Sequence, residues 1–209
     1  MKLTVLLLLL LPVAGCGSLF KNKTAPPTMY WLSASPSSSA VQPQAAIDPA
    51  VLRADLAVLK PRVRAGLDTD RVAALYPDRR LEYFADVRWS GPLDEVLQDL
   101  AVQELHSHPR MRNVSTDASA FPSDYWLEIE VVDFQAEYAA PNTAPTVHVH
   151  FLARIGNSAD RRILGRFEPD VHEAAAGNRM SAIIDAYNRA AGSALAEIAA
   201  GAASALSAP

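Results

Sequence analysis

Cysteine is nearly absent from this sequence, which has one cysteine in 209 residues. A single cysteine excludes an internal disulfide and any zinc site built from several cysteines. The sequence also lacks an excess of basic residues, since 19 lysines and arginines stand against 23 aspartates and glutamates and give a net charge of −4. Proteins that bind nucleic acid usually carry a basic field, so we expect no nucleic-acid partner.

Catalytic motifs and long apolar runs are missing as well. The sequence has no Gly-x-Ser-x-Gly elbow, phosphate-binding loop, His-Glu-x-x-His zinc motif or dinucleotide fingerprint. Beyond its N-terminal segment, no apolar run reaches the roughly 20 residues that a transmembrane helix needs. We therefore expect a non-enzymatic protein without a cofactor, whose body does not span a membrane.

The N-terminus has the order of a bacterial export signal. Lys2 precedes a mainly apolar run from Leu3 to Val13, and small residues follow up to Cys16. This run is too short to cross a bilayer as a helix, for which about 20 residues are needed. We predict a signal peptide over residues 1–15 that is removed in front of Cys16.

The junction Val13-Ala14-Gly15-Cys16 resembles the bacterial lipobox. This resemblance implies that the Cys16 thiol receives a diacylglyceryl group and that the mature lipoprotein carries several acyl chains, palmitate among them. Several chains hold a protein stably in a membrane, whereas one chain binds only marginally. In similar sorting signals an Asp after the cysteine favours the inner membrane. Gly17 stands there in this chain, which implies the outer membrane, on its periplasmic face.

The composition divides the mature chain into a tether and one domain. Residues 16–49 are rich in serine, proline, alanine and threonine, which predicts an extended tether. Within the tether, the apolar segment Met29-Tyr30-Trp31-Leu32 predicts a short strand near 29–32 at the edge of a sheet. We expect a periplasmic domain over residues 50–201 and a flexible tail over 202–209, because the last residues are small and polar.

Hydrophobic periodicity indicates the strands and helices of this domain. Alternation with a period of two predicts strands, and three-and-four spacing predicts helices with one apolar side. The expected strands cover 58–67, 81–89, 125–131, 147–155 and 163–167, and the expected helices cover 92–105 and 180–198. Together they predict an α+β fold with two layers, in which two helices pack on one face of a mainly antiparallel sheet.

The same alternation leaves charged residues on the side of the sheet that faces away from the helices. Such a face can simply be solvated, or it can dock another protein or further copies of this chain. We take its prominent members as candidate partner-binding residues. They are Arg62, Arg64, Arg88, Glu128, Glu130, His148 and His150.

The best metal candidate in the sequence is the pair His148 and His150. A spacing of two places both imidazoles on one side of a strand, and Glu128 or Glu130 is expected to face them from the neighbouring strand. Solvated histidines on an open sheet face explain this pair more simply, so we predict no metal site. His172 stands alone in the sequence pattern.

Three short motifs carry a resemblance to a known family. The segments are Leu67-Asp68-Thr69-Asp70-Arg71-Val72, Leu81-Glu82-Tyr83-Phe84 and Arg88-Trp89-Ser90-Gly91-Pro92-Leu93, the last followed by an amphipathic helix. Together with Tyr30-Trp31-Leu32 and the lipobox, they resemble the ABC-type transport auxiliary lipoprotein component family, the PqiC-like proteins. The resemblance runs over nearly the whole mature chain. The residues that match the family pattern as structural residues are Arg71, Tyr83, Trp89 and Pro92.

This resemblance implies a non-enzymatic lipoprotein that works beside an MCE-domain protein and its ABC transporter in moving lipids between the two membranes. In that arrangement the MCE-domain protein forms the lipid conduit, and this protein receives or docks its outer end. Trp89, at a corner between strand and helix, is expected to lie in the core. Three alternatives are a lipid carrier with its own cavity, a structural or assembly lipoprotein of the outer membrane, and a periplasmic hydrolase. The alanine-rich second helix indicates close packing, which favours the docking protein over the carrier.

Overall fold

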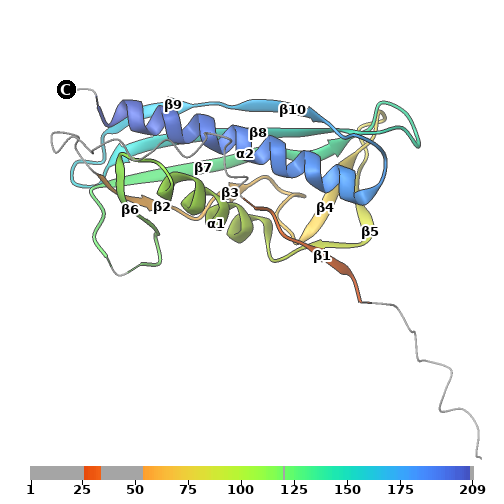
Figure 1. Cartoon of the computed structure of the whole chain (residues 1–209), viewed down its shortest axis with the longest axis horizontal. Coiled ribbons are helices and arrows are strands. Elements are labelled where there is room, and N and C mark those ends of the chain that lie inside the picture. Colours follow the sequence, from red (N-terminus) through yellow and green to blue (C-terminus); the bar gives the residue numbers. More distant parts are fainter. Residues whose placement is uncertain (1–25, 34–53, 120, 208–209) are drawn as a thin grey trace, which may run out of the picture.

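The computed structural model describes residues 26–33, 54–119 and 121–207, which form ten strands and two helices (Figure 1). Cys16, the predicted signal peptide and most of the predicted tether lie outside the described residues. In chain order the elements are β1 Thr28–Tyr30, β2 Ala54–Val58, β3 Arg62–Val63, β4 Arg71–Leu75, β5 Leu81–Trp89, α1 Leu93–His106, β6 Met111–Thr116, β7 Tyr125–Glu137, β8 Thr146–Asn157, β9 Ile163–Phe167, β10 Asp170–Ala174 and α2 Met180–Ala205.

The long hairpin of β7 and β8 forms the middle of the sheet. These strands are antiparallel, and their register runs from Tyr125 opposite Asn157 to Glu137 opposite Thr146. The other edge of β7 pairs in parallel with β2, β3 and β4, while the other edge of β8 pairs antiparallel with β9 and β10. Beyond these strands, β5 pairs antiparallel with β4, β6 lies parallel to β2, and β1 lies parallel to β5.

Both helices cover the same face of this sheet, with α2 over β8, β9 and β10 and α1 beside α2 and against β6 (Figure 1). The predicted α+β fold, with two helices on one face, is therefore confirmed. The longest pairing, between β7 and β8, is antiparallel as expected. The parallel pairing of β7 with three shorter strands was not predicted.

The first helix forms where the sequence predicts it. Pro92 directly precedes the first helical residue, a place where its missing N–H removes no helical hydrogen bond. Asp94 and Glu95 lie in the first turn, where their negative charge favours the positive end of the helix dipole. The leucines of the predicted stripe point into the core, and Leu105 near the end of the helix is fully buried. Burial of this stripe fixes α1 to the sheet.

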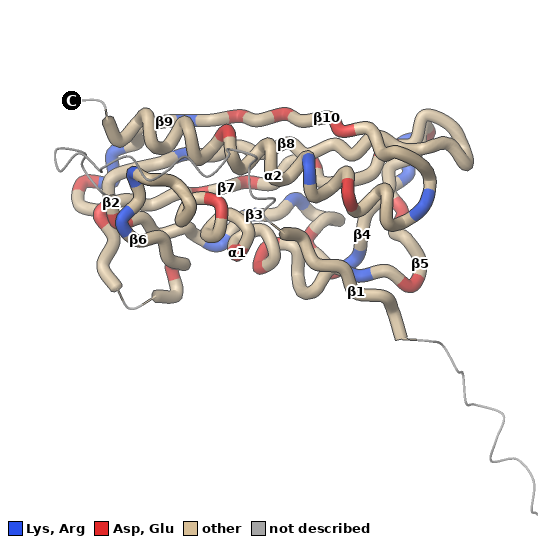
Figure 2. The backbone as a smooth tube through the Cα atoms, in the orientation of Figure 1, with Lys and Arg blue, Asp and Glu red and all other residues tan. Residues whose placement is uncertain are grey.

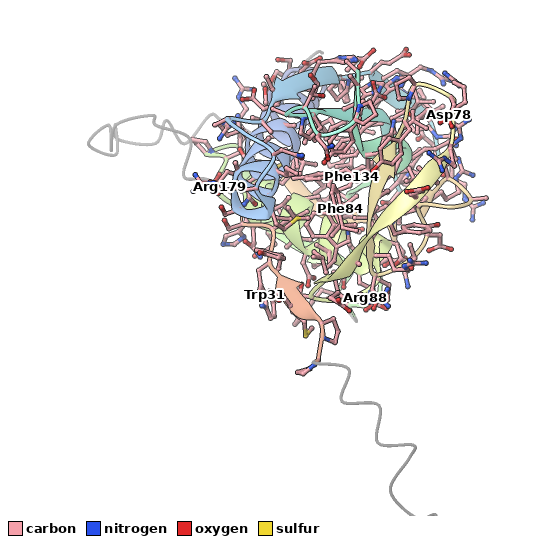
Figure 3. The ribbon with its side chains drawn as sticks, turned by 90° about the vertical axis from the view of Figure 1, so that its right-hand side faces the viewer. Trp31, Asp78, Phe84, Arg88, Phe134 and Arg179 are labelled. Carbon is pink, nitrogen blue, oxygen red and sulfur yellow. The ribbon has the colours of Figure 1, made fainter. Side chains whose placement is uncertain are left out.

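Three aromatic rings fill the space between the sheet and α2. Trp89, Phe134 and Tyr187 are each at most 1% exposed, and their ring centroids lie 5.1 to 5.9 Å apart. The Tyr187 hydroxyl donates a hydrogen bond of 2.9 Å to the carbonyl of Ala73, so its burial leaves no unpaired polar atom. The expectation that Trp89 lies in the core is confirmed, and Phe134 is seen within the layer in Figure 3.

The predicted strand over 58–67 is wrong as one continuous element. β2 ends at Val58, and β3 covers only Arg62 and Val63. Pro61 stands between them and has no N–H to donate to a neighbouring strand. The intervening chain instead turns toward α1, where the Lys60 amino group lies 3.0 Å from the Asp94 carboxylate.

Strands β4, β6 and β10 were missed, as was β2 before Val58, where the expected strand began. In β4 three successive residues are buried, Val72, Ala73 and Ala74, so the pattern has no alternation to detect. β10 spans five residues and carries two acidic residues and a histidine, which resemble a loop in composition. The predicted strand over 81–89 is present as β5, but a left-handed residue, Asp86 with φ of 54°, interrupts its alternation, and Leu81 at its start is exposed.

The second helix is longer than predicted and reaches Ala205. Ala202 and Ala203 are buried, so the flexible tail expected over 202–209 does not begin at residue 202. The small residues of α2 bring it close to the sheet, as expected. A side chain at Gly201 would place its Cβ 2.5 Å from the Phe167 ring.

Candidate interaction face

The face of the sheet opposite the helices, which we call the open face, carries polar side chains from β3, β7, β8 and β10. Because successive residues of a strand point to opposite sides, Glu128 and Glu130 project here while Leu127 and Ile129 enter the core. The register of β7 and β8 shifts between Val131 and Asp133. After this shift the open face receives the side chains of Asp133, Gln135 and Glu137.

One half of the open face is built around arginines, and we call it the arginine region: Arg62, Arg64, Glu128, Glu130, Asp133 and Arg154. Arg62 Nη2 lies 3.1 Å from Glu128 and 3.4 Å from Glu130, and Arg64 Nη1 lies 3.6 Å from Asp133. Arg154 donates a hydrogen bond of 2.6 Å to Glu128. This hydrogen bond, together with the charge of Arg62, holds the pKa of the Glu128 carboxyl below its ordinary value.

A shallow hollow of about 310 Å³ opens within the arginine region. Its floor includes Leu152, whose side chain is partly exposed opposite Glu130. Arg166 and Glu168 border it from the neighbouring segment. Basic and acidic side chains therefore surround a small apolar patch, an arrangement that can receive a polar segment of another protein.

The other half of the open face is built around histidines, and we call it the histidine region: Glu137, His148, His150, Asp170 and His172. His148 Nδ1 lies 3.0 Å from Glu137 Oε1, and its Nε2 lies 2.8 Å from Asp170 Oδ1. The ring of His172 stacks on His148 with centroids 4.1 Å apart. His150 contacts Glu168 at 3.3 Å and Asp133 at 3.7 Å. In Figure 2 a basic position on β9 is followed by acidic positions toward and along β10.

Opposing influences act on the pKa of His148. Burial alone would lower this pKa, but the hydrogen bonds to Glu137 and Asp170 and the charges of nearby carboxylates outweigh it and raise the pKa above its ordinary value. Among the described residues, neither Glu137 nor Asp170 has a lysine or arginine nitrogen within 4.0 Å. Histidines are therefore the ion-pair partners of these two carboxylates within this distance.

The structure brings together six of the seven predicted partner-binding residues. Arg62, Arg64, Glu128 and Glu130 lie in the arginine region, and both predicted histidines lie in the histidine region. Arg88 is separate, because it pairs with Asp70 at 3.2 Å and stands opposite Met29 of β1. Figure 3 shows Arg88 and Trp31 at the same end of the molecule.

Two details of the histidine prediction are wrong. The carboxylates expected to face His148 and His150 were those of Glu128 and Glu130, but Asp133 stands opposite His150, and Glu137 contacts His148. His172 does not stand alone, because β10 pairs with β8 and places it opposite His148. Both errors come from pairing that the sequence pattern does not specify: the register of the hairpin and the existence of β10.

The four structural residues of the family motifs meet at one corner of the sheet. The Arg71 guanidinium lies over the Tyr83 ring at 3.9 Å, and the Tyr83 hydroxyl donates a hydrogen bond of 2.7 Å to the carbonyl of Gly66. Gly66 has a φ of +91°, a backbone conformation that residues other than glycine rarely adopt. Trp89 follows on β5, and Pro92 leads into α1. Arg71 and Tyr83 thus contact each other and the turn at Gly66, while Trp89 is buried in the core.

Exposed apolar side chains were missed as candidate contacts. Phe121, in the segment between β6 and β7, is 81% exposed and borders a surface hollow of about 480 Å³ with Leu59 and Trp126. Trp31 and Met29 are also mostly exposed. An isolated phenylalanine in a polar loop gives no periodic signal, so only its position in the fold identifies it.

In the described part of the chain, no helix combines the length and hydrophobicity required to span a bilayer.

Comparison with known proteins gives a family match and a set of similar folds. The sequence model of the ABC-type transport auxiliary lipoprotein component family matches residues 30–199. No curated protein matches the chain. A DUF330 protein of Xanthomonas campestris has a similar structure, with a TM-score of 0.65 and 20% identity, over 87% of this chain and 95% of that protein.

Two further solved structures share the fold. One, an uncharacterized protein, superposes with a TM-score of 0.63 at 15% identity, over 84% of this chain and 98% of the other. The other is a hypothetical protein of Chlamydia trachomatis, with a TM-score of 0.51 at 12% identity over 75% of this chain and 99% of the other. At these identities the likeness concerns the arrangement of strands and helices.

Proposed function

Because the chain belongs to the ABC-type transport auxiliary lipoprotein component family, we propose that it is a non-enzymatic periplasmic accessory of an MCE-type ABC lipid transport system. In this proposal Cys16 carries the lipid anchor, the outer membrane holds it, and the domain docks the MCE-domain partner that conducts lipid between the membranes. The open face is the docking surface.

The observation that carries this proposal is the charge-paired open face, which neither described helix covers. The helices leave this side of the sheet free, and its ion pairs involve side chains that are still accessible, such as Arg62 and Arg64 at about 60% exposure. Alternating positive and negative groups match a partner of complementary charge and select its orientation. A face of this kind can exchange its internal ion pairs for pairs with a partner.

The packing of the interior favours a docking protein over a lipid carrier. A carrier needs an apolar cavity, but the layer between sheet and helices is filled by Trp89, Phe134 and Tyr187. Among the described residues, no serine or threonine hydroxyl is hydrogen-bonded to a histidine, the pairing that a serine hydrolase uses. These observations support a role in binding other proteins.

A charge-reversal pull-down tests the docking surface. We expect Arg62→Glu with Arg64→Glu to capture at least tenfold less of the MCE-domain partner than wild type, because like charges then meet across the interface. The matched control is Arg80→Glu with Arg189→Glu, which makes the same charge change at two similarly exposed, ion-paired arginines away from the open face. Equal capture by both double variants would remove the arginine region from the interface.

The lipid anchor is tested separately at Cys16. Cys16→Ala should move the protein from the membrane fraction to the soluble fraction, because the thiol that accepts the lipid is gone. Retention of this variant in the membrane pellet after a salt wash would contradict the lipoprotein anchor and leave the docking surface untouched.

The exposed Phe121 and its hollow favour one second candidate, a domain that holds a lipid chain at its surface. Leu59 and Trp126 supply apolar walls, but Asp117 and Arg161 also border the hollow. Mass spectrometry of lipid extracted from the purified full-length protein and from Phe121→Asp separates the candidates. Stoichiometric phospholipid that is lost in Phe121→Asp would favour the carrier, and its absence from wild type favours the docking protein.

A further inference from the structure

Three metal-ligating groups from three neighbouring strands converge in the histidine region. They are Glu137 at the end of β7, His148 on β8 and His172 on β10, and one donor atom from each lies within 4.8 Å of the others. The convergence follows from the register, because His172 stands directly opposite His148, and β7 places Gln135 opposite His148 on its other side. Alternation then directs Glu137 to the same face as both imidazoles.

We propose that Glu137, His148 and His172 form a binding site for a divalent transition-metal ion on the open face. Two imidazoles and a carboxylate form a donor set typical of Zn²⁺ and of other borderline divalent ions, whereas Mg²⁺ and Ca²⁺ prefer oxygen ligands. The site does not depend on the proposed transport function, since it rests on the side chains alone.

The charge balance of the histidine region supports this assignment. In the arginine region each carboxylate has a guanidinium within 4.0 Å. In the described part of the chain, histidines are the only ion-pair partners of Glu137 and Asp170. A bound cation would neutralise these carboxylates directly, taking the place of a proton on the imidazole that becomes its ligand.

Neighbouring groups are placed to orient the ligands. Gln135 donates a hydrogen bond of 3.0 Å to Glu137 Oε1, and Asp170 lies 2.8 Å from His148 Nε2. A carboxylate that holds the second nitrogen of a ligating histidine is a usual feature of zinc sites, because it fixes the ring orientation and makes the ring more basic. This assigns His148 Nδ1, which faces Glu137, as the metal-binding nitrogen.

To close around an ion, His172 must rotate out of its stack on His148, because an imidazole nitrogen binds metal in the plane of its ring. Zinc bonds of about 2.0–2.1 Å place tetrahedral ligand atoms about 3.4 Å apart. The present separations of up to 4.8 Å therefore shorten by about 1.4 Å at most. His172 can make this movement, because its side chain is 52% exposed and β10 pairs only with β8 among the described strands.

Zinc binding to the full-length protein in detergent tests the site, with any histidine tag removed first. We expect wild type to bind about one Zn²⁺ per chain by competition with a zinc dye and by elemental analysis after desalting. Glu137→Gln, His148→Ala and His172→Ala should each weaken binding at least tenfold. His106→Ala, at the end of α1, is the matched control and should bind as wild type does.

A thermal shift gives an independent readout, because an ion held by β7, β8 and β10 stabilises the folded state. Zn²⁺ at 100 times its dissociation constant should raise the wild-type Tm by about 5–10 °C, and equimolar Mg²⁺ should not. If His148→Ala fails to fold, the exposed His172→Ala and the isosteric Glu137→Gln still decide. The proposal is overturned if wild type binds no Zn²⁺ at 100 μM, or if these variants bind it as tightly as wild type. Loss of binding in His150→Ala with retention in His172→Ala would overturn the ligand set.

Discussion

Along β7, one strand serves two unlike surfaces. Leu127, Ile129 and Val131 point into the layer beneath the helices and are at most 1% exposed, whereas Glu128 and Glu130 point to the open face and bind arginines. Burying a large apolar side chain stabilises a fold by about 1.5–3 kcal/mol, and an exposed ion pair contributes about 0–1 kcal/mol. The covered face therefore supplies most of the stability, and the open face is left free to bind.

The same contrast recurs within the open face. In the arginine region the positive charges are permanent, because guanidinium groups stay protonated in proteins. In the histidine region the positive charge depends on a proton, or on a metal ion under our proposal. One sheet thus separates three tasks: packing, constant charge and adjustable charge. Side-chain alternation separates the covered face from the open face, and strand register separates the two regions of the open face.

The largest expected effect belongs to the covered face. Trp89→Ala should lower the free energy of unfolding by about 3–5 kcal/mol, because it empties the space between Phe134 and Tyr187. Chemical denaturation followed by circular dichroism measures the change. An unchanged midpoint together with lost partner capture would make Trp89 a contact residue and break the separation of the two faces.

A smaller effect is expected where α2 approaches the sheet. Gly201→Ala should destabilise the protein by about 1–3 kcal/mol, since the new Cβ would lie 2.5 Å from the Phe167 ring. Gly192→Ala in the same helix is the control. Apart from its own helical turn, no described residue lies within 4 Å of a Cβ there, so the better helix propensity of alanine should stabilise by about 0.5–1 kcal/mol. Thermal melts that shift in the same direction for both variants would contradict this account of the helix–sheet contact.

The smallest effect concerns the ionised arginine region. The hydrogen bond from Arg154 lowers the pKa of the Glu128 carboxyl in the folded state below its unfolded value, near 4.5. Above pH 4.5 the ionised carboxyl therefore stabilises the folded state. This stabilisation is lost as the pH falls through the lower pKa of the folded state. Between about pH 5 and pH 2, wild type should lose up to about 1 kcal/mol more stability than Glu128→Gln. Parallel stability curves for the two proteins over this window would show that the pair contributes nothing.

The sequence alone predicted the elements with strong periodicity. The β7–β8 hairpin, the leucine stripe of α1 and the spacing in α2 each gave a regular apolar pattern, and Trp89 was correctly placed in the core. The same alternation identified Arg62, Arg64, Glu128 and Glu130 as members of one face. Local pattern is enough for these features because each one is fixed within a single element.

Features that depend on pairing could not be predicted from a local pattern. The shift after Val131 changes which side chains of β7 reach the open face, and the sequence gives no sign of it. The same holds for β10, which has only two apolar residues among five and so gives no clear strand pattern, and His172 was left without a partner. Parallel pairing of β2, β3 and β4 with β7 joins segments far apart in the chain, where no hairpin turn fixes the register.

We propose that the open face, and not the helix-covered side, docks the transport partner. Photo-crosslinking in living cells tests it directly, with a photoreactive residue at Leu152 on the open face or at the exposed Asp185 on the outer surface of α2. The account predicts that the Leu152 position crosslinks to the MCE-domain protein and that the Asp185 position does not. Crosslinks from Asp185 with none from Leu152 would contradict it and assign docking to the helical side.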